Sequence, residues 1–357
     1  MSLFSPGNAQ WSRRRVLRSA AQSMALLPAA RVFAQQAPAQ QQEAAPQPIK
    51  ISVSEVIVPV TVTDSKGRFV SNLDQQDFQI YDQGKLQSIS YFSRERSQPV
   101  VAGFLLDLSN GSRIQWKSYQ EAAEDLVLSL LPGDKKYSGY LIGYNNQAEL
   151  MVNTTSDAEP IVQKIGKLKP GGGSAMYDAI YYACTTRKLI QGEPVEPRRI
   201  IIIIGDGHDN ASKHTMAEVL ELAQRNLVTI YGVSTLAFGN DVEGDDDLNK
   251  LADETGGRVE YPLQDVYKNL VSGYLSTPSD EGNFALKVGT GGYASALSSS
   301  IFRAITNVAG EITTQYILRY IPDVPPDPER QFREITVKVA LADVKVRARH
   351  GYYTSLP

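Results

Sequence analysis

The sequence has only one cysteine, Cys184, and three histidines among its 357 residues. An intrachain disulfide is therefore excluded, and any metal site would have to be built mainly from oxygen ligands, which disfavours zinc. A basic surplus is also missing, because 36 Lys and Arg stand against 39 Asp and Glu, a formal net charge of −3. Tight contacts to a nucleic-acid backbone need such a surplus, so we do not expect nucleic acid as a partner.

Long hydrophobic runs are lacking as well. No apolar segment approaches the roughly 20 residues that cross a bilayer, so no membrane span is expected. The chain is nevertheless 42% apolar and 21% charged, a composition typical of globular proteins. At roughly 150 residues per domain, its length predicts about two domains.

The first 34 residues have the order of an export signal. Residues 12–18 read Ser-Arg-Arg-Arg-Val-Leu-Arg, a mildly apolar run covers 20–27, and Val32-Phe33-Ala34 ends in a cleavage-like pattern. The arginines with the following hydrophobic pair resemble a twin-arginine signal. This predicts a bacterial protein exported in folded form to the periplasm or the extracellular space.

Removal of this signal changes the charge of the chain. The mature protein keeps 31 basic and 39 acidic residues, a net charge of −8. No cysteine follows the signal directly, so no lipid anchor is expected. Residues 35–48, which are rich in Gln, Ala and Pro, are predicted to form a flexible linker.

Residues 49–96 show the pattern of an all-β segment. Apolar residues alternate from Ile51 to Val62 with one change of phase, and Pro59 suggests that this strand lies at a sheet edge. The turn residues 82–84 predict a hairpin between strands at 78–81 and 86–92.

Residues 97–275 change to alternating strands and helices. The continuous apolar runs at 100–106 and 200–204 are typical of parallel strands that are covered on both faces. Further strands are expected at 137–144, 148–153 and 228–234, with helices at 116–131, 158–167, 175–189, 216–226 and 246–255. This order predicts a doubly wound α/β domain with a mostly parallel sheet.

The remaining residues return to β structure. Residues 276–300 are rich in Gly and Ser and are predicted to form a mobile insertion. A helix is expected at 301–314, and the insertion together with the first part of this helix forms the segment 276–310. Strands are expected at 316–321, 335–341 and 344–352. We predict that residues 311–357 pair with residues 49–96, so that both chain ends build one small β-sandwich.

Polar residues follow the predicted parallel strands. Asp107, Ser109 and Ser112 follow the first strand, Ser174 ends a glycine run, and Asp206 follows the strand at 200–204. Carboxyl ends of parallel strands meet at one edge of a sheet, so these residues should converge. Two carboxylates with hydroxyls form an oxygen set that suits Mg²⁺, Mn²⁺ or Ca²⁺.

These residues resemble the metal-ion-dependent adhesion site of the von Willebrand factor type A family, whose pattern is D-x-S-x-S, then Thr, then Asp. Asp107 and Ser109 match the first two positions, while Gly111 stands where the family has its second serine, a gap that Ser112 could fill. Ser174 replaces the threonine and Asp206 matches the last aspartate. The resemblance, over about residues 97–275, implies that Ser109 and Ser174 bind the cation directly and the two aspartates largely through water.

The resemblance implies a non-enzymatic protein that binds another protein through an acidic side chain completing the coordination of the cation. The whole mature chain further resembles a bacterial, exported subgroup related to this family, as in Val60-Thr-Val-Thr-Asp64 and Arg347-Ala-Arg-His-Gly351-Tyr-Tyr. That subgroup adds no known reaction.

Two alternatives remain open. The first is an envelope scaffold without metal, in which Asp107 and Asp206 only cap helices and the β unit or the insertion binds the partner. The second is a serine hydrolase, because residues 107–111 partly resemble a G-x-S-x-G nucleophile elbow with Ser109 as nucleophile. Its base would have to be one of the three histidines, His208, His214 or His350, and the acid at position 107 would oppose an oxyanion.

Overall fold

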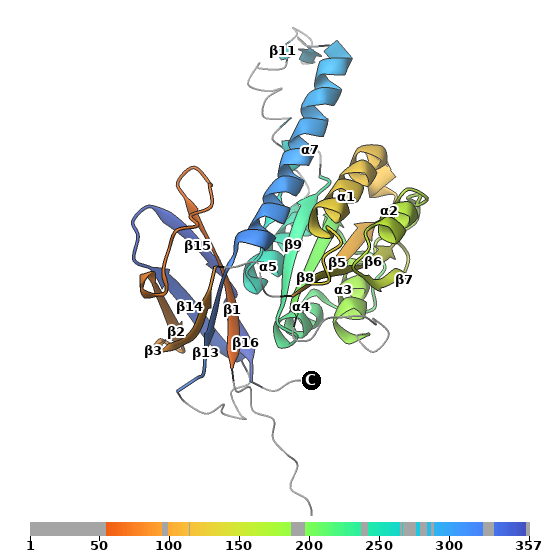
Figure 1. The fold of residues 1–357 in the computed structure, drawn as a ribbon. Coiled ribbons are helices and arrows are strands. Elements are labelled where there is room, and N and C mark those ends of the chain that lie inside the picture. The colour runs from red at the N-terminus through yellow and green to blue at the C-terminus, as the bar shows by residue number, and fades with distance from the viewer. Residues whose placement is uncertain are drawn as a thin grey trace, which may run out of the picture. The chain divides into compact units, whose positions relative to one another are not determined.

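The computed structural model describes residues 55–94, 99–113, 115–186, 197–236, 242–264, 266, 276–278, 284–286, 289–323 and 332–354. The expected signal peptide and linker lie outside these described residues. Figure 1 shows a sheet covered by helices, together with a group of strands built from both ends of the described chain. The described residues all fall within one unit, residues 50–357.

A six-stranded sheet forms the centre of the α/β region, in the order β10-β9-β8-β5-β6-β7. Its strands are parallel except β7, which runs antiparallel to β6. Every residue of β5 is buried, as its uninterrupted apolar sequence requires. The predicted fold class is confirmed. The strand bounds are β5 (Val100–Asp107), β6 (Tyr137–Tyr144), β7 (Ala148–Thr155), β8 (Arg198–Gly205), β9 (Val228–Ser234) and β10 (Val259–Glu260).

The strand order reverses at β5. From β5 the chain proceeds to β6 on one side, whereas β8, β9 and β10 follow on the other side. In open α/β sheets, the crevice at the carboxyl ends of the two strands beside such a reversal is the usual ligand position. Leu106 lies opposite Ile204 in the register of β5 and β8, so the residues after these two positions meet at that crevice.

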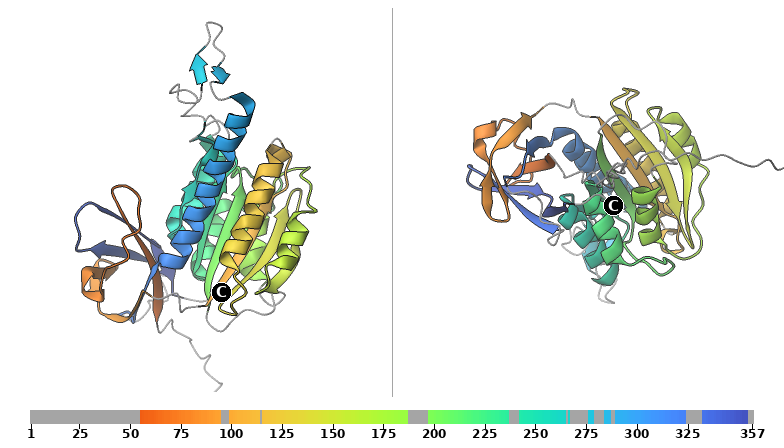
Figure 2. Two further views of the ribbon diagram at one scale, coloured as in Figure 1. Left: turned by 45° about the horizontal axis from the view of Figure 1, so that its top comes forward. Right: turned by 90° about the horizontal axis from the view of Figure 1, so that it is seen from below.

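Helices cover both faces of the sheet (Figure 2). One set of apolar residues on β5, including Val100 and Phe104, packs against α1, α2 and α7, and the alternate set, including Val101 and Leu105, packs against α3, α4 and α5. Within the described ranges, no helix is both long and apolar enough to cross a membrane. The helix bounds are α1 (Trp116–Leu130), α2 (Glu159–Ile165), α3 (Met176–Thr185), α4 (Met216–Arg225), α5 (Val242–Thr255) and α7 (Gly289–Thr314).

Helix α7 begins twelve residues earlier than the sequence predicted, at Gly289 instead of Ile301. Gly and Ser have weak helix propensity, which is why residues 289–300 were interpreted as part of a loop. From Leu297 onward, tertiary contacts override that preference. Ser300 is buried and its hydroxyl donates to the Pro262 carbonyl at 2.9 Å, and Ile301, Ile305 and the following apolar residues pack into the core that α1 and α2 share on the same face of the sheet. The insertion also contains an antiparallel strand pair, β11 (Ser276–Pro278) and β12 (Phe284–Leu286).

Two four-stranded antiparallel sheets, β15-β1-β13-β4 and β16-β14-β2-β3, are built from the N-terminal and C-terminal segments. Strand β1 pairs with β13 and β15, and β2 pairs with β14. The predicted sandwich from both chain ends is therefore present. Its strands are β1 (Val56–Asp64), β2 (Phe78–Asp82), β3 (Lys85–Gln87), β4 (Ile89–Ser93), β13 (Tyr316–Tyr320), β14 (Phe332–Val339), β15 (Val344–Ala348) and β16 (Gly351–Tyr353).

Two segments that were predicted as single strands are each divided in two. Residues 86–92 separate into β3 and β4 at Ser88, and residues 344–352 separate into β15 and β16 at Arg349 and His350. In both cases the consecutive strands belong to different sheets. The hairpin with β2 therefore pairs only Ile80–Asp82 with Lys85–Gln87. Strands that change sheet at an edge of a sandwich keep their apolar pattern, so the break was not visible in the sequence.

Pro59 was predicted to place its strand at a sheet edge, and for the strand as a whole this was wrong, because β1 lies between β15 and β13. However, β1 pairs with β13 over Val56–Val60 and with β15 only from Val60 onward. Pro59 therefore has a strand neighbour on one side only, which is what its missing N–H requires.

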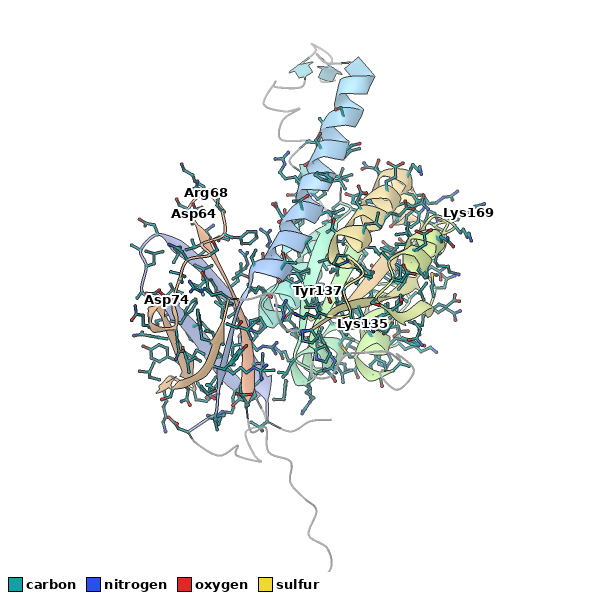
Figure 3. The ribbon with its side chains drawn as sticks, in the orientation of Figure 1. Asp64, Arg68, Asp74, Lys135, Tyr137 and Lys169 are labelled. Carbon is teal, nitrogen blue, oxygen red and sulfur yellow. The ribbon has the colours of Figure 1, made fainter. Side chains whose placement is uncertain are left out.

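The turn after β1 forms around Asp64 (Figure 3). The Asp64 Oδ1 atom accepts hydrogen bonds from the backbone N–H groups of Lys66 and Arg68, each at 2.9 Å, and Oδ2 accepts one from Arg68 Nε at 2.8 Å. The Arg68 backbone N–H contributes most to lowering the pKa of Asp64. Gly67 supplies the left-handed conformation that the turn needs, with φ at +77°.

Candidate metal centre

Asp107 and Asp206 lie at the ends of the neighbouring strands β5 and β8. Asp107 is 1% exposed and the Asp206 side chain is 17% exposed. Each carboxylate shapes its own loop: Asp107 Oδ1 accepts the Ser109 N–H at 2.7 Å, and Asp206 Oδ1 accepts the His208 N–H at 3.0 Å. These are the local side-chain bonds that aspartate forms in turns.

The two carboxylates oppose each other's ionisation. Burial, followed by the negative charge of Asp206, raises the pKa of Asp107 to about 6, although the Ser109 N–H partly offsets both effects. The His208 ring lies beside Asp206, with Nδ1 at 3.3 Å from Oδ2. Neighbouring carboxylates in a buried position are costly unless a positive charge compensates them.

Glycine residues leave the space that these carboxylates occupy. A Cβ atom on Gly205 would lie 2.5 Å from the Tyr144 hydroxyl and 2.8 Å from the Asp107 Cβ. A Cβ atom on Gly111 would lie 2.7 Å from Asp206 Oδ2 and 3.4 Å from the Ser109 hydroxyl. The second serine of the family pattern would therefore require Asp206 to move, and the space beside Gly111 is bordered by two oxygen atoms.

Ser174 is tied to the loop that carries Asp206. Its side chain is buried, and its hydroxyl donates to the His208 carbonyl at 2.7 Å. Its backbone N–H donates to Asn210 Oδ1 at 2.9 Å, and its carbonyl accepts the Asn210 N–H at 2.9 Å. Because the hydroxyl hydrogen is directed at His208, the lone pairs of the Ser174 oxygen face other directions and remain able to bind a cation.

The glycine loop before Ser174 connects to two further segments. The Gly171 N–H donates to the Leu108 carbonyl at 2.7 Å, and the Gly173 N–H donates to Asn146 Oδ1 at 2.7 Å. The three predicted segments thus meet at one edge, together with the turn between β6 and β7. Asn146 was not predicted from the sequence: it lies two residues after the end of the buried strand β6, and its contact with Gly173 depends on the path of the turn.

The oxygen atoms at this edge fit a hard cation. Among the described residues, Asp107 Oδ2 and the Ser112 hydroxyl are buried and have no hydrogen-bond partner. Ser112 nevertheless lies close enough to contribute to lowering the pKa of Asp107. Two carboxylates, buried hydroxyls and the space at Gly111 form a donor set of the type that Mg²⁺, Mn²⁺ and Ca²⁺ prefer. No group of three His, Cys, Asp or Glu side chains in the described part of the chain could hold a metal, so the hydroxyls are essential to this set.

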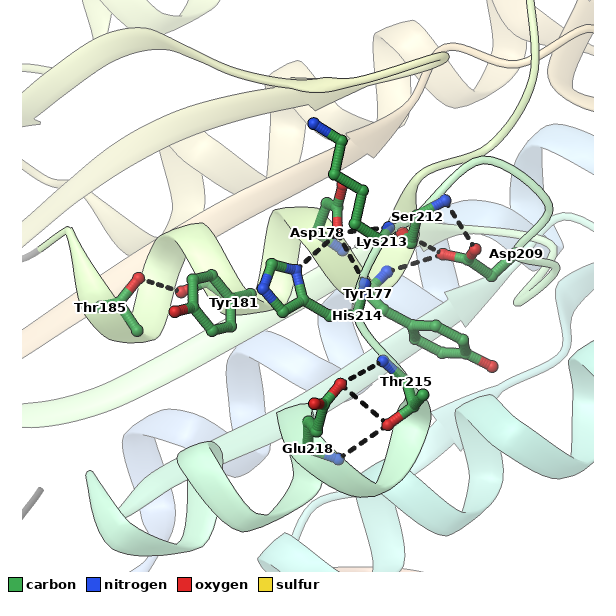
Figure 4. Close-up of polar contacts among 10 residues, drawn as sticks. All are labelled: Tyr177, Asp178, Tyr181, Thr185, Asp209, Ser212, Lys213, His214, Thr215 and Glu218. Atoms are coloured by element: carbon green, nitrogen blue, oxygen red, sulfur yellow. Dashed lines mark hydrogen bonds and ion pairs between the residues drawn. The ribbon is translucent and has the colours of Figure 1, made fainter.

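Two further aspartates near the site serve the loop instead (Figure 4). Asp209 Oδ2 accepts the Tyr177 N–H at 2.8 Å and the Ser212 hydroxyl at 2.6 Å. Asp178 Oδ1 accepts the backbone N–H of Lys213 at 3.0 Å and has a contact of 2.7 Å with His214 Nδ1. These bonds fasten the start of α3 to the loop after β8.

The charge state of Asp178 follows from these contacts. Partial burial opposes its ionisation, but donors from His214 and Lys213 outweigh that effect and hold its pKa below the ordinary value. The His214 ring also stacks on Tyr181, with ring centroids 3.6 Å apart. Asp178 is therefore an ionised acceptor whose Oδ1 atom is occupied by donors of the loop.

The family model of the von Willebrand factor type A domain matches residues 103–270. This region is a von Willebrand factor type A domain. The type A fold and the resemblance seen in the sequence are thereby confirmed, and domains of this family typically serve as non-enzymatic modules of protein interaction. None of the curated proteins matches the chain.

Several solved structures resemble the chain at low identity. BatB from Bacteroides thetaiotaomicron is 17% identical, with 60% of this chain and 97% of that chain covered and a TM-score of 0.34. The PilB minor pilin from Streptococcus sanguinis is 10% identical, with 61% and 62% covered and a TM-score of 0.40. Proximal thread matrix protein 1 from the mussel byssus, with a zinc-occupied metal-ion-dependent adhesion site, is 15% identical, with 47% and 42% covered and a TM-score of 0.36. The type A assignment rests on the family model and the fold.

Proposed function

We propose that this type A domain binds another protein through a divalent cation held at the edge between β5 and β8. The observation that supports this proposal is the pair Asp107 and Asp206, two neighbouring carboxylates beside hydroxyl oxygens. Asp107 is buried, and its Oδ2 atom has no hydrogen-bond partner among the described residues. Cation binding would relieve the repulsion between them. The proposed ligands are Asp107, Ser109, Ser174 and Asp206, with Ser112 in the role of the serine that Gly111 replaces.

The chain supplies charge and oxygen atoms in a fixed arrangement. The two aspartates contribute the negative charge, and the serine hydroxyls contribute neutral oxygen donors. Bound Mg²⁺, or alternatively Mn²⁺ or Ca²⁺, would supply a positive charge with an open position for a carboxylate of the partner. The partner chemistry that fits is therefore an acidic side chain on a protein surface.

Calorimetric titration of the mature protein with Mg²⁺, Mn²⁺ and Ca²⁺ tests the cation site. We expect saturable binding to the native protein and none to the double variant Asp107→Asn/Asp206→Asn, whose amides keep the shape of the carboxylates. The double variant Asp125→Asn/Asp134→Asn removes the same charge at two exposed positions and should bind normally. Absence of binding by the native protein up to millimolar cation would reject the site.

Partner capture tests the function itself. Crosslinking and affinity capture from the native cell envelope, with and without a chelator, should recover a partner only when the cation is present. The double variant Asp107→Asn/Asp206→Asn should lose that partner. Capture that is unaffected by both chelator and variant favours the metal-independent scaffold.

The β-sandwich supports a metal-independent scaffold as the second candidate function. An open groove of about 1070 Å³ lies at the side of the sandwich formed by β3 and β4, and its lining includes Phe78, Leu86, Tyr91 and Phe92. Leu86 and Tyr91 are 56% and 42% exposed. Leu86→Ser/Tyr91→Ser should abolish partner capture if the scaffold alternative is correct, and should leave it intact if the cation edge is the binding site.

A hydrolase centred on Ser109 is the weakest alternative. Among the described residues no histidine is hydrogen-bonded to the Ser109 hydroxyl, and the neighbouring Asp107 carboxylate would oppose an oxyanion. A fluorophosphonate probe should therefore leave the protein unlabelled, whereas covalent labelling at Ser109 would support hydrolysis.

We also propose that the protein is exported to the periplasm or the cell exterior through the signal at residues 1–34, which lies outside the described residues. The support is the order of basic, apolar and small residues in the sequence. Arg13→Lys/Arg14→Lys should cause uncleaved precursor to accumulate inside the cell. Normal export of that variant would contradict the twin-arginine route.

A further inference from the structure

Two exposed asparagines from different loops converge on Gly173. Asn146 lies in the turn between β6 and β7, and Asn210 lies in the loop after β8. A Cβ atom on Gly173 would lie 2.8 Å from Asn210 Oδ1 and 3.1 Å from Asn146 Oδ1. We refer to Asn146 and Asn210 as the asparagine pair. The pair therefore flanks the residue directly before the proposed ligand Ser174.

The hydrogen bonds of the pair fix the orientation of both amides. Asn146 Oδ1 accepts the Gly173 N–H at 2.7 Å, and Asn210 Oδ1 accepts the Ser174 N–H at 2.9 Å. A backbone N–H needs an acceptor, so each amide directs its oxygen at the loop and its Nδ2 atom away from that contact. Neither Nδ2 atom has a hydrogen-bond partner in the described part of the chain. Each amide thus presents an NH₂ group with unused donors on an exposed side chain.

The position of these donors suggests what they bind. The neighbouring centre holds the carboxylates of Asp107 and Asp206, so a partner carboxylate that approaches it meets negative charge of the protein. Neutral N–H donors attract a carboxylate without competing with the cation. A lysine or arginine, being positively charged, would compete with it. Hydrogen bonds from an amide to a carboxylate are also stronger than those to a neutral oxygen.

We propose that the asparagine pair is a specificity determinant of the partner site: its Nδ2 atoms donate hydrogen bonds to the acidic side chain of the partner. This inference rests on the proposed function, because it concerns the same edge. The two ends of each amide then have separate tasks. The oxygen holds the loop of Ser174, and the nitrogen selects an acidic partner side chain over its neutral amide analogue.

Substitution by aspartate separates these two tasks. In Asn146→Asp and Asn210→Asp, a carboxylate oxygen still accepts the backbone N–H, while an anionic oxygen replaces the donor. The probes are sensor surfaces coated densely with acetyl-Ala-Ala-Glu-Ala-Ala-amide or with the matching Gln peptide, and the full mature protein is passed over them in Mg²⁺. Calorimetry of the same proteins with Mg²⁺ alone supplies the second measurement.

We expect the two measurements to change in opposite directions. Each aspartate variant should bind the Glu surface about tenfold more weakly, through loss of a charge-assisted hydrogen bond. Its affinity for Mg²⁺ should rise by about threefold, because a negative charge is added near the cation. Asn146→Ala and Asn210→Ala remove both the acceptor and the donor and should weaken both kinds of binding.

Gln147→Glu is the matched control, because it adds the same charge at an exposed position in the same turn as Asn146. It should change Glu-surface binding less than Asn146→Asp does. Equal losses in the two variants, or unchanged binding by the aspartate variants, would overturn the role of the pair while the proposed function stands. If the native protein shows no Mg²⁺-dependent preference for the Glu surface, the proposed function and this inference both fail.

Discussion

At the scale of the single residue, Asp107 makes the stability of the fold depend on pH, because it is buried beside the negative charge of Asp206. Its pKa rises from an ordinary value of 3.8 to about 6. Without a cation, the folded protein therefore holds a proton on Asp107 at pH values where the unfolded chain has lost it. Stability from this group is complete below about pH 4 and is lost as the pH rises through about 6.

Asp107→Asn should stabilise the cation-free protein at pH 7.5, since the amide removes the buried charge and still accepts the Ser109 N–H. A pKa raised from 3.8 to about 6 corresponds to about 2 to 3 kcal/mol in the free energy of unfolding. Urea unfolding at pH 7.5 and at pH 3.5, with chelator present, measures it. The gain should disappear at pH 3.5, and a gain that is equal at both pH values would contradict the electrostatic explanation.

The residues of the site differ in how far the sequence could identify them. Asp107, Ser109, Ser174 and Asp206 were predicted together because strand ends and glycine runs reveal which residues face the crevice. Asn146 belongs to a turn after the next strand, and its contact with Gly173 depends on the path of that turn. No local pattern encodes this path, so only the tertiary structure identified Asn146 as a partner of the loop.

At the scale of elements, helix α3 and the loop after β8 behave as one hydrogen-bonded unit. Asp178 on α3 receives the backbone N–H groups of Lys213 and His214 and the His214 side chain. Asp209 on the loop receives the Tyr177 N–H in return. The two segments that contain Ser174 and Asp206 should therefore move together.

Asp178→Ala should loosen this unit, because three donors lose a shared acceptor. We expect a loss of about 1 to 3 kcal/mol in the free energy of unfolding. Amide hydrogen exchange at Lys213 and His214 should accelerate at the same time. Asp178→Asn keeps an acceptor oxygen and should retain most of the stability, so an equal loss in both variants would argue against the hydrogen bonds as the cause.

Secondary structure was predictable where local pattern and tertiary packing agree. The buried run of β5 shows such agreement, and its bounds match the sequence prediction within one residue. Helix α7 shows the opposite case, because its Gly and Ser residues disfavour helix although it begins at Gly289, and its packing against the core starts only at Leu297. The breaks between β3 and β4 and between β15 and β16 depend on which sheet each strand joins, which an apolar pattern does not record.

At the scale of the whole described chain, a buried carboxylate connects segments that are far apart in the sequence. Glu311 on α7 is fully buried. It accepts the Thr61 hydroxyl of β1 at 3.0 Å and pairs with Arg347 of β15 at 2.7 Å and with Arg258 at 2.9 Å. The sandwich strands and the helix that packs on the central sheet therefore share one polar cluster.

Glu311→Ala should destabilise the protein, because Arg347 loses its ion pair and Arg258 keeps only Glu260, at 2.7 Å. Breaking one side of a buried ion pair typically costs about 3 to 5 kcal/mol. Thermal unfolding followed by circular dichroism measures the loss. Glu254→Ala, which removes a partly exposed partner of His350, is the control and should cost about 1 kcal/mol or less.

The sequence by itself determined the α/β class, the contribution of both chain ends to a β-sandwich and the identity of the oxygen-bearing residues at the crevice. These features follow from periodicity, composition and strand ends, which act over a few residues. The tertiary structure alone decided that the Gly111 position leaves room for Asp206, that Asn146 and Asn210 hold the loop of Ser174, and that Glu311 joins the sandwich to α7. Those outcomes depend on distances between segments remote in the chain, and such distances are set by packing of the whole fold.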